Sequence, residues 1–382
     1  MESSPNRSEL GAFGLPGKYV ASQEIFQQET DLIFSAHWNC VGHVSSLGNS
    51  GLMPIEFEGQ KLLVALDGAN VRVFRNFCRH RGSQLVTPEN CQSLGQRIQC
   101  PYHAWTYQRD GKLVAAPNME DVEGFNADDF GLIEVPSEVV GGFIWIHLSV
   151  PESAKLTAQQ FLAPIANQFK GWSMDEMVVV KSICYQVNAN WKLIFQNYNE
   201  CYHCPTVHPI LNRLTPYKDA DNEVLAGPIL GGPMQLSNGT ETMSMDGALV
   251  GEPLPNLSDR QRREVNYYTV FPSMFLSTHP DYVLVHRIKR LSMNTTSVVC
   301  DFLFHGDVVR EGFDPSRAVE FWDMTNRQDW EVCELAQAGM HDPGYTPGPY
   351  SNLESVVAAF DAHYLASLEL RTQNVTSVSD GR

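Results

Sequence analysis

Basic side chains are scarce in this sequence of 382 residues. It contains 27 Lys and Arg residues against 44 Asp and Glu residues, which gives a formal net charge of −17 at pH 7. A protein that binds nucleic acid presents a basic patch or stripe to the phosphates, and the sequence contains no run of that kind. The composition therefore argues against nucleic acid as a partner.

Long apolar runs and a disulfide framework are also lacking. No stretch approaches the ~20 apolar residues of a membrane-spanning helix, and the first residues, MESSPNRSELG, have no apolar core of a signal peptide. The cysteines number nine, an odd count, and are spread from Cys40 to Cys333, which favours reduced thiols in a chain of this length. These features predict a cytoplasmic protein that does not enter a membrane.

The pattern of short strands and turns predicts more than one domain. Between residues 38 and 150, the runs KLLVAL, VRVF, QRIQC and GGFIWIHL are separated by turns such as DGAN and RDGK, as in a small antiparallel domain. Residues 18–37 and 151–169 have helical patterns, and helices are expected near 190–203 and 321–339 among further β-rich runs. We therefore expect an all-β domain at 38–150, inserted into an α+β domain formed by residues 1–37 and 151–382.

Two motifs inside the expected β domain each place a cysteine close to a histidine. They are CRHRG at residues 78–82 and CPYH at residues 100–103. A Rieske 2Fe-2S cluster needs two thiolates on one iron and two imidazoles on the other, so Cys78 and Cys100 would hold the first iron and His80 and His103 the second. A structural zinc site with the same four ligands is the alternative.

A second set of candidate ligands follows in the segment NWKLIFQNYNECYHCPTVHP. His203 and His208 lie on opposite sides of Pro205, which we expect to break the helix and let His208 turn back toward His203. Asp329 lies on the apolar stripe of a predicted helix and could complete a 2-His-1-carboxylate site for Fe(II). Taken alone, the two histidines could be ordinary ones, and Asp329 could be a helix cap or an ion-pair partner.

Taken together, these motifs are similar to those of the oxygenase α subunit of Rieske non-haem iron oxygenases. The similarity runs from about residue 30 to residue 365 and rests on CRHRG, CPYHAWTY, NWK, NECYHC, His208 and RQDW. It implies a Rieske domain inserted into a helix-grip (START-like) catalytic domain with an antiparallel sheet, assembled as a homotrimer. It also implies that the cluster of one subunit reduces the iron of its neighbour, with Glu200 bridging His203 to His103 across the subunit interface.

Within this superfamily, glutamate rather than aspartate at the bridge resembles the branch that oxidises quaternary and tertiary methylated amines such as choline, glycine betaine and carnitine. Gln196 departs from the ENY pattern of that branch, which puts a charge-based role at this position in doubt. A substrate cation would bind over aromatic faces, although aromatic residues at these spacings are more often core. The candidates are Tyr198, Tyr202, Phe271, Phe275, Tyr282, Trp322 and Trp330.

The resemblance implies O₂ as co-substrate and a small-molecule substrate. The glycine pairs at Gly141 and Gly231 lack the strand–turn–helix setting of a nucleotide site, so we expect NAD(P)H to contribute only through a separate reductase. Three alternatives remain open at this point. They are hydroxylation or O-demethylation of an aromatic substrate, a pure electron carrier, and a ligand-binding helix-grip module with structural zinc.

Overall fold

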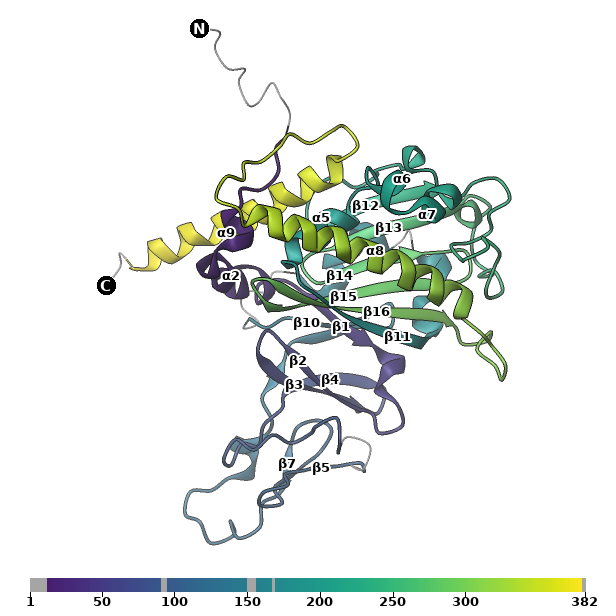
Figure 1. The fold of residues 1–382 in the computed structure, drawn as a ribbon. Coiled ribbons are helices and arrows are strands. Elements are labelled where there is room, and N and C mark those ends of the chain that lie inside the picture. The colour runs from purple at the N-terminus through teal and green to yellow at the C-terminus, as the bar shows by residue number, and fades with distance from the viewer. Residues whose placement is uncertain (1–11, 91–94, 150–155, 167–168, 380–382) are drawn as a thin grey trace. The chain divides into compact units, whose positions relative to one another are not determined.

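The computed structural model describes residues 12–90, 95–149, 156–166 and 169–379, and it divides the chain into two compact units. The inserted unit is Ala36–Ala163, and the discontinuous unit combines Met1–Ser35 with Pro164–Arg382. Figure 1 shows strands in both units and long helices in the discontinuous one. The predicted fold class, an all-β domain inserted into an α+β domain, is confirmed.

The inserted unit is built from three small antiparallel sheets. The predicted DGAN turn joins two of its strands, and Gly68 takes a φ of +61° there, a conformation that glycine adopts without strain. In strand order, the sheets are β1 (Asn39–His43), β10 (Phe143–Ile146) and β9 (Ser137–Val140); β2 (Leu52–Phe57), β3 (Gln60–Asp67), β4 (Asn70–Arg75) and β8 (Glu134–Val135); and β5 (Ile98–Gln99), β6 (Thr106–Tyr107) and β7 (Leu113–Ala115).

The inserted unit ends later than the sequence pattern suggested. Helix α3 (Ala158–Phe161) packs on this unit, with the Phe161 ring 6.3 Å from that of Trp145. The Trp38 indole also donates a hydrogen bond to the Leu156 carbonyl oxygen (2.9 Å). These contacts carry the unit to Ala163, beyond the boundary expected at residue 150.

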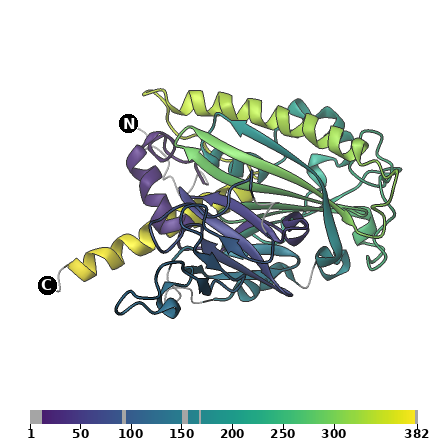
Figure 2. The ribbon, with the colours of Figure 1, turned by 90° about the horizontal axis from the view of Figure 1, so that it is seen from below.

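The discontinuous unit has a six-stranded antiparallel sheet, and helix α8 (Ser316–Met340) lies along one face of it in Figures 1 and 2. Helix α8 buries Phe321, Trp322 and Thr325 at helical spacing, which is why it lies on the sheet. The strand order is β11 (Met177–Val187), β16 (Thr295–His305), β15 (Val283–Ser292), β14 (Met274–Thr278), β13 (Glu264–Val270) and β12 (Ile229–Gln235). The other α-helices are α1 (Lys18–Ala21), α2 (Gln23–Glu29), α4 (Ala163–Ala166), α5 (Trp191–Tyr198), α6 (Cys204–Val207), α7 (Pro209–Leu214) and α9 (Ser355–Ser379).

The helix expected at 190–203 is shorter, and Pro205 has a different role from the predicted one. Helix α5 ends at Tyr198, and a separate short helix, α6, begins at Cys204. Pro205 lies in the first turn of α6, where its missing N–H leaves no intrahelical hydrogen bond unmade. The chain reverses between α5 and α6 because the helix stops before Glu200, rather than because proline interrupts it.

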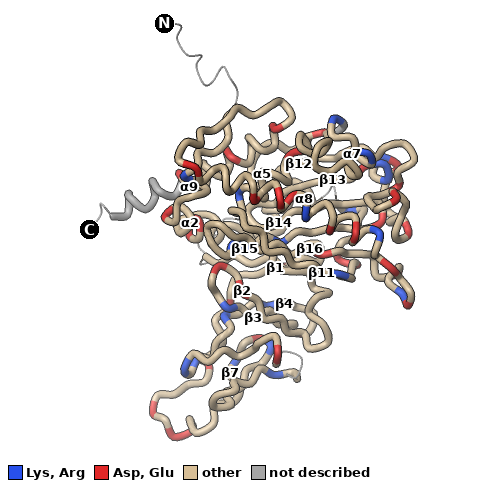
Figure 3. Tube along the Cα trace, in the orientation of Figure 1, with Lys and Arg blue, Asp and Glu red and all other residues tan. Residues whose placement is uncertain are grey.

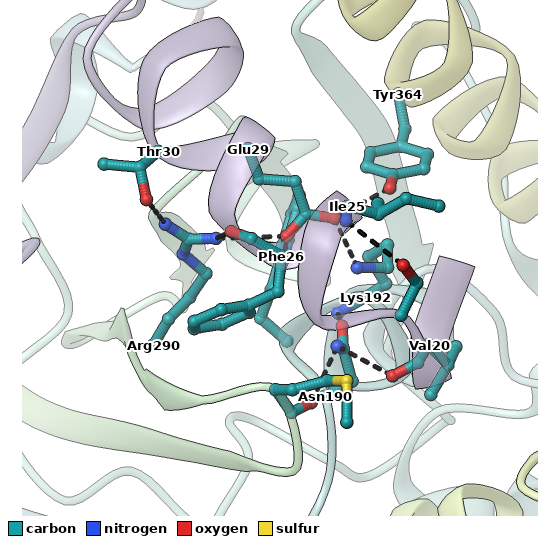
Figure 4. A network of polar contacts seen from close by, with 12 residues as sticks. Val20, Ile25, Phe26, Glu29, Thr30, Asn190, Lys192, Arg290 and Tyr364 are labelled. Atoms are coloured by element: carbon teal, nitrogen blue, oxygen red, sulfur yellow. Dashed lines mark hydrogen bonds and ion pairs between the residues drawn. The ribbon is translucent and has the colours of Figure 1, made fainter. Parts of the chain in front are cut away.

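A buried ion network ties the N-terminal segment to the rest of the discontinuous unit. Figure 4 shows the Glu29 carboxylate between Lys192 and Arg290. Glu29 Oε1 lies 2.5 Å from Lys192 Nζ and accepts a hydrogen bond from the Tyr364 hydroxyl (2.7 Å), while Oε2 lies 3.1 Å from Arg290 Nη1. The Trp191 indole also donates to Oε2 (2.9 Å). The NWK motif thus anchors residues that precede the inserted unit.

Replacing Glu29 by glutamine should destabilise the protein strongly. The change would leave two buried cations without their shared carboxylate, at a cost of about 3–5 kcal/mol in the free energy of unfolding. We expect the midpoint of thermal unfolding to fall by at least about 6 °C. The exposed Glu24 on the same helix is the matched control, and Glu24→Gln should change the stability by less than about 0.5 kcal/mol. Equal effects of the two substitutions would contradict this account of the network.

The distribution of charged residues and the character of the helices agree with the amino-acid composition. In Figure 3, the Lys and Arg positions are scattered among more numerous Asp and Glu positions. No helix in the described ranges combines the length and the apolar character needed to cross a membrane.

Candidate active site and metal centres

Three predicted ligands from distant parts of the sequence meet in the discontinuous unit. His203 and His208 flank α6, and Asp329 projects from α8. The Oδ1 atom of Asp329 lies 3.3 Å from His203 Nε2 and 2.7 Å from His208 Nε2. Among the residues that the structure describes, this is the one set of three or more His, Cys or acidic side chains whose donor atoms all lie within 4.8 Å of one another.

Hydrogen bonds on the far side of each imidazole set its orientation. The Nδ1–H of His203 donates to Glu200 Oε1 (2.5 Å), and the Nδ1–H of His208 donates to Gln328 Oε1 (2.8 Å). Both Nε2 atoms are thereby directed toward Asp329. The site offers two imidazole nitrogens and one carboxylate oxygen, and a hydrogen-bond acceptor holds each imidazole from behind. This donor set fits a mononuclear Fe(II) ion.

The electrostatics of this cluster favour positive charge between the ligands. Burial would raise the pKa of Asp329, but hydrogen bonds from His203 and His208 outweigh it and lower this pKa to about 2. Burial would lower the pKa of His203, yet the Asp329 and Glu200 carboxylates raise it to about 10. The two carboxylates therefore stabilise a cation at this position, as a divalent metal requires.

The three ligands lie in the wall of a cavity of about 220 Å³. Of the seven predicted aromatic residues, Tyr198, Tyr202 and Trp322 line it. The Tyr198 hydroxyl and the Ser277 hydroxyl share a hydrogen bond (2.6 Å), and the Trp322 indole donates to the Tyr282 hydroxyl (2.7 Å), so both rings are fixed. Tyr202 is largely exposed.

The other four predicted aromatic residues lie outside the lining of this cavity. Phe271 and Phe275 pack around Phe195 in the core, with ring centroids 6.4 and 4.6 Å away. Tyr282 is fully buried and stacks on His279 (4.0 Å), behind Trp322. Trp330 lies beside Tyr185 (5.9 Å). All four side chains are buried in the core, where large aromatic residues are usually found.

Several lining or supporting residues were not predicted. Tyr267 lies in the cavity wall on β13, whereas the neighbouring Tyr268 faces the other side of the strand. Side chains alternate between the two faces of a strand, so the run NYYTV could have indicated that one of the two tyrosines faces the cavity. Asn199 and Thr325 also line the cavity. Gln328, which supports His208, directly precedes Asp329 in the RQDW motif, but its contact depends on how α8 meets α6 and cannot be derived from spacing.

Gln196, the departure from the ENY pattern, lies away from the metal ligands. Its amide donates to Asp361 Oδ1 (2.7 Å), whose other oxygen accepts from the Tyr350 hydroxyl (2.7 Å). Burial raises the pKa of Asp361 to about 6, although these two hydrogen bonds oppose the shift. A neutral amide at position 196 therefore avoids placing a second carboxylate against a buried one.

The two cysteine–histidine motifs form a pair of turns in the inserted unit. Cys78 and Cys100 are buried, while His80 and His103 are exposed, with ring centroids 4.8 Å apart. The Gly82 N–H bonds the Cys78 carbonyl oxygen (2.9 Å), and the Ala104 N–H bonds the Cys100 carbonyl oxygen (3.1 Å). Two turns of the same form thus direct buried thiols and exposed imidazoles toward one region.

Aromatic residues cover this region. The Trp105 ring stacks on His80 with centroids 4.8 Å apart and an interplanar angle of 7°. The Tyr107 hydroxyl lies 3.2 Å from Cys78 Sγ and accepts a hydrogen bond from the Arg79 N–H (3.1 Å). Burial raises the pKa of the Cys78 thiol, and the Tyr107 hydrogen bond opposes this shift by favouring the thiolate.

This donor set fits a two-iron cluster better than one zinc ion. A single zinc would need all four donor atoms around one point, yet no three of these donors form a compact group within the described part of the chain. Two thiols on the buried side and two imidazoles on the exposed side match the division of ligands in a Rieske cluster.

Comparisons with known proteins agree with both centres. Residues 174–369 match the family model described as ring hydroxylating alpha subunit (catalytic domain), and residues 37–126 match the Rieske [2Fe-2S] domain. The chain is 29% identical, over 90% of its length and 86% of the relative, to the glycine betaine monooxygenase oxygenase subunit of Pseudomonas aeruginosa.

Solved structures share the fold at low sequence identity. A quaternary ammonium Rieske monooxygenase studied for carnitine oxidation matches with a TM-score of 0.78 at 21% identity, over 95% of this chain and 97% of the other. Naphthalene 1,2-dioxygenase from Rhodococcus sp. matches with a TM-score of 0.76 at 18% identity, over 93% and 94%. The catalytic-domain match excludes a pure electron carrier. The chain therefore belongs to the ring-hydroxylating alpha subunit family, as an oxygenase that combines a Rieske [2Fe-2S] domain with a catalytic domain for mononuclear iron.

Proposed function

We propose that this protein is the terminal component of a monooxygenase that hydroxylates a C–H bond of a methylated quaternary or tertiary amine. Hydroxylation of an N-methyl group would lead to oxidative N-demethylation. The observation that carries the proposal is the juxtaposition of the His203–His208–Asp329 group with aromatic faces in one cavity. Trp322, Tyr267 and Tyr198 line it, with Tyr267 6.2 Å from each of the other two rings. Aromatic faces attract an alkylammonium ion.

The position of Trp322 suits a small substrate. Trp322, Thr325 and Asp329 follow one another on one face of α8, and seven residues of helix span about 10 Å. A cation resting on the Trp322 ring would place its methyl groups toward the metal ligands. Iron held by His203, His208 and Asp329 would supply the activation of O₂, and the chain's own contribution is to orient the ligands and the substrate.

We further propose that electrons arrive from a separate reductase and pass between subunits of a homotrimer. Glu200 would connect His203 with His103 of a neighbouring subunit. Within its own chain, Glu200 Oε1 binds the His203 ring, while Oε2 accepts the main-chain N–H groups of Tyr202 and His203. Both oxygens are held, which would make the carboxylate a rigid bridge. The eight described cysteines are all free, which supports a cytoplasmic location.

A panel of substrates tests the proposal. The purified protein, loaded with both iron centres and supplied with a generic reductase, should consume O₂ faster with methylated amines, and the demethylated amine and formaldehyde should appear in equal amounts. For a choline-like substrate, the expected product is the aldehyde formed from its carbinol carbon. Stimulation by aromatic compounds alone, with hydroxylated or O-demethylated products, would overturn the amine assignment and favour the aromatic reaction. Binding of amines without O₂ consumption would instead indicate a ligand-binding module.

A further inference from the structure

Two buried hydrogen-bond donors in the active-site cavity have no acceptor among the described residues. They are the amide Nδ2 of Asn199 and the hydroxyl of Tyr267, and both residues line the cavity. A buried polar group without a partner destabilises the protein, so such groups commonly bind a ligand or an ordered water. We infer that these two donors form a subsite for a carboxylate group of the substrate. The inference rests on the proposed function and narrows its substrate to amines that also carry a carboxylate.

The orientation of Asn199 is fixed by its neighbours. Its side-chain oxygen accepts a hydrogen bond from the Thr269 hydroxyl (3.0 Å), which assigns the oxygen to that side and the NH₂ group to the other. Asn199 is only 7% exposed and follows the last residue of α5. Its amide is therefore built into the wall, and it presents a donor rather than an acceptor.

Tyr267 presents its donor from the same stretch of wall. Tyr267 and Thr269 lie two residues apart on β13, so their side chains emerge on one face about 7 Å apart. The Thr215 hydroxyl approaches the Tyr267 hydroxyl and lowers its pKa by favouring the ionised form, but Thr215 donates its own hydrogen to the Leu211 carbonyl oxygen (3.3 Å), and no contact of hydrogen-bond geometry within the described residues satisfies the Tyr267 hydroxyl. Burial raises the pKa of Tyr267 well above 10, so the phenol keeps its proton.

The chemistry of the donors indicates which part of a substrate they accept. An ammonium group cannot accept a hydrogen bond, whereas a carboxylate accepts several. The Tyr267 ring lies 6.2 Å from the Trp322 ring. A carboxylate bound to the Asn199 amide and the Tyr267 hydroxyl would therefore still allow the cationic group of the same substrate to bind over the Trp322 ring. Lys218, which also lines the cavity, adds positive charge to its wall. A zwitterion whose two charges lie a few bonds apart could place its carboxylate on the Asn199 and Tyr267 donors and its ammonium group on the Trp322 ring.

Binding to the holoenzyme with an oxidised cluster tests the subsite without turnover. Calorimetric titrations would compare trimethylammonium carboxylates of increasing chain length, beginning with glycine betaine, with the alcohols that replace the carboxylate by CH₂OH, beginning with choline. We expect Tyr267→Phe to weaken binding of the best carboxylate about 10- to 100-fold and that of its alcohol less than about twofold. Asn199→Leu should show the same selectivity.

Tyr198→Phe is the matched control, because the Tyr198 hydroxyl is already bonded to Ser277. It should change the affinities for carboxylate and alcohol by the same factor. Equal losses for both ligands in Tyr267→Phe, or no loss for either, would overturn the subsite while leaving amine oxidation intact. If the protein bound aromatic carboxylic acids with a loss in Tyr267→Phe and bound no amine, the subsite would stand and the proposed amine substrate would fail.

Discussion

Replacing Asp329 by alanine should abolish product formation while leaving the Rieske cluster in place. Asp329 supplies the single carboxylate of the three-ligand group, and both histidine Nε2 atoms are directed at it. Loss of that ligand removes one of three donors and the negative charge that favours a divalent ion at this place. We expect turnover to fall at least about 1000-fold, which corresponds to several kcal/mol of lost transition-state stabilisation.

Metal analysis distinguishes this effect from misfolding. The variant should retain two irons and two sulfides per chain with an unchanged cluster spectrum, and should lose the third iron. Asp323→Asn is the matched control on the same helix, since Asp323 binds Tyr185 and Arg327 instead of the ligand group. Its turnover should stay within about twofold of the unsubstituted protein. Retention of the third iron in Asp329→Ala would show that another side chain completes the site.

Replacing Glu200 by glutamine should separate the two metal centres functionally. The substitution keeps the length of the side chain and an oxygen near His203 Nδ1, and it gives up only the hydrogen bonds that Oε2 accepts from the main-chain N–H groups of Tyr202 and His203, so both centres should remain loaded. It removes the negative charge from the proposed bridge, and changes to groups that hold a metal-binding histidine commonly cost 10- to 100-fold. We expect a reductase to reduce the cluster at its usual rate and the subsequent reoxidation of the cluster, with O₂ and substrate present, to slow by about 100-fold.

Stopped-flow absorbance of the cluster measures this step directly. Glu334→Gln provides a matched control, because Glu334 on α8 binds the exposed Asn188 rather than a metal ligand. A purely structural role for Glu200 would appear as lost iron or a lower thermal midpoint, with reoxidation normal in the fraction of protein that retains iron. Unchanged reoxidation in fully loaded protein would refute the bridging role.

Local patterns predicted most of the helices and strands, although the helix expected at 190–203 ends at Tyr198, and they indicated two candidate ligand groups. Cys78, His80, Cys100 and His103 lie in two short motifs, and the cluster turns depend on hydrogen bonds within each motif, so spacing alone indicated them. His203 and His208 are close in sequence for the same reason. Asp329 was found because a carboxylate on an apolar helical stripe needs a partner.

The cavity wall was predicted less well because it depends on contacts between distant segments. Phe271, Phe275 and Tyr282 are aromatic residues of the kind that could line a binding site, yet β14 and the turns on either side of it place them in the core or behind Trp322. Asn199 is important only because Thr269, far along the chain, fixes its amide. The buried network around Glu29 likewise joins three segments that no local pattern connects.

A single-turnover experiment tests the central claim most directly. Protein loaded with both centres would be reduced chemically, freed of reductant, and mixed with O₂ and a methylated amine, followed by product analysis. We predict that cluster oxidation is accompanied by demethylated or hydroxylated amine, at up to about one product per mononuclear iron, and that Asp329→Ala gives none. Cluster oxidation without any amine product across the panel, together with hydroxylation of an aromatic compound under the same conditions, would contradict the account.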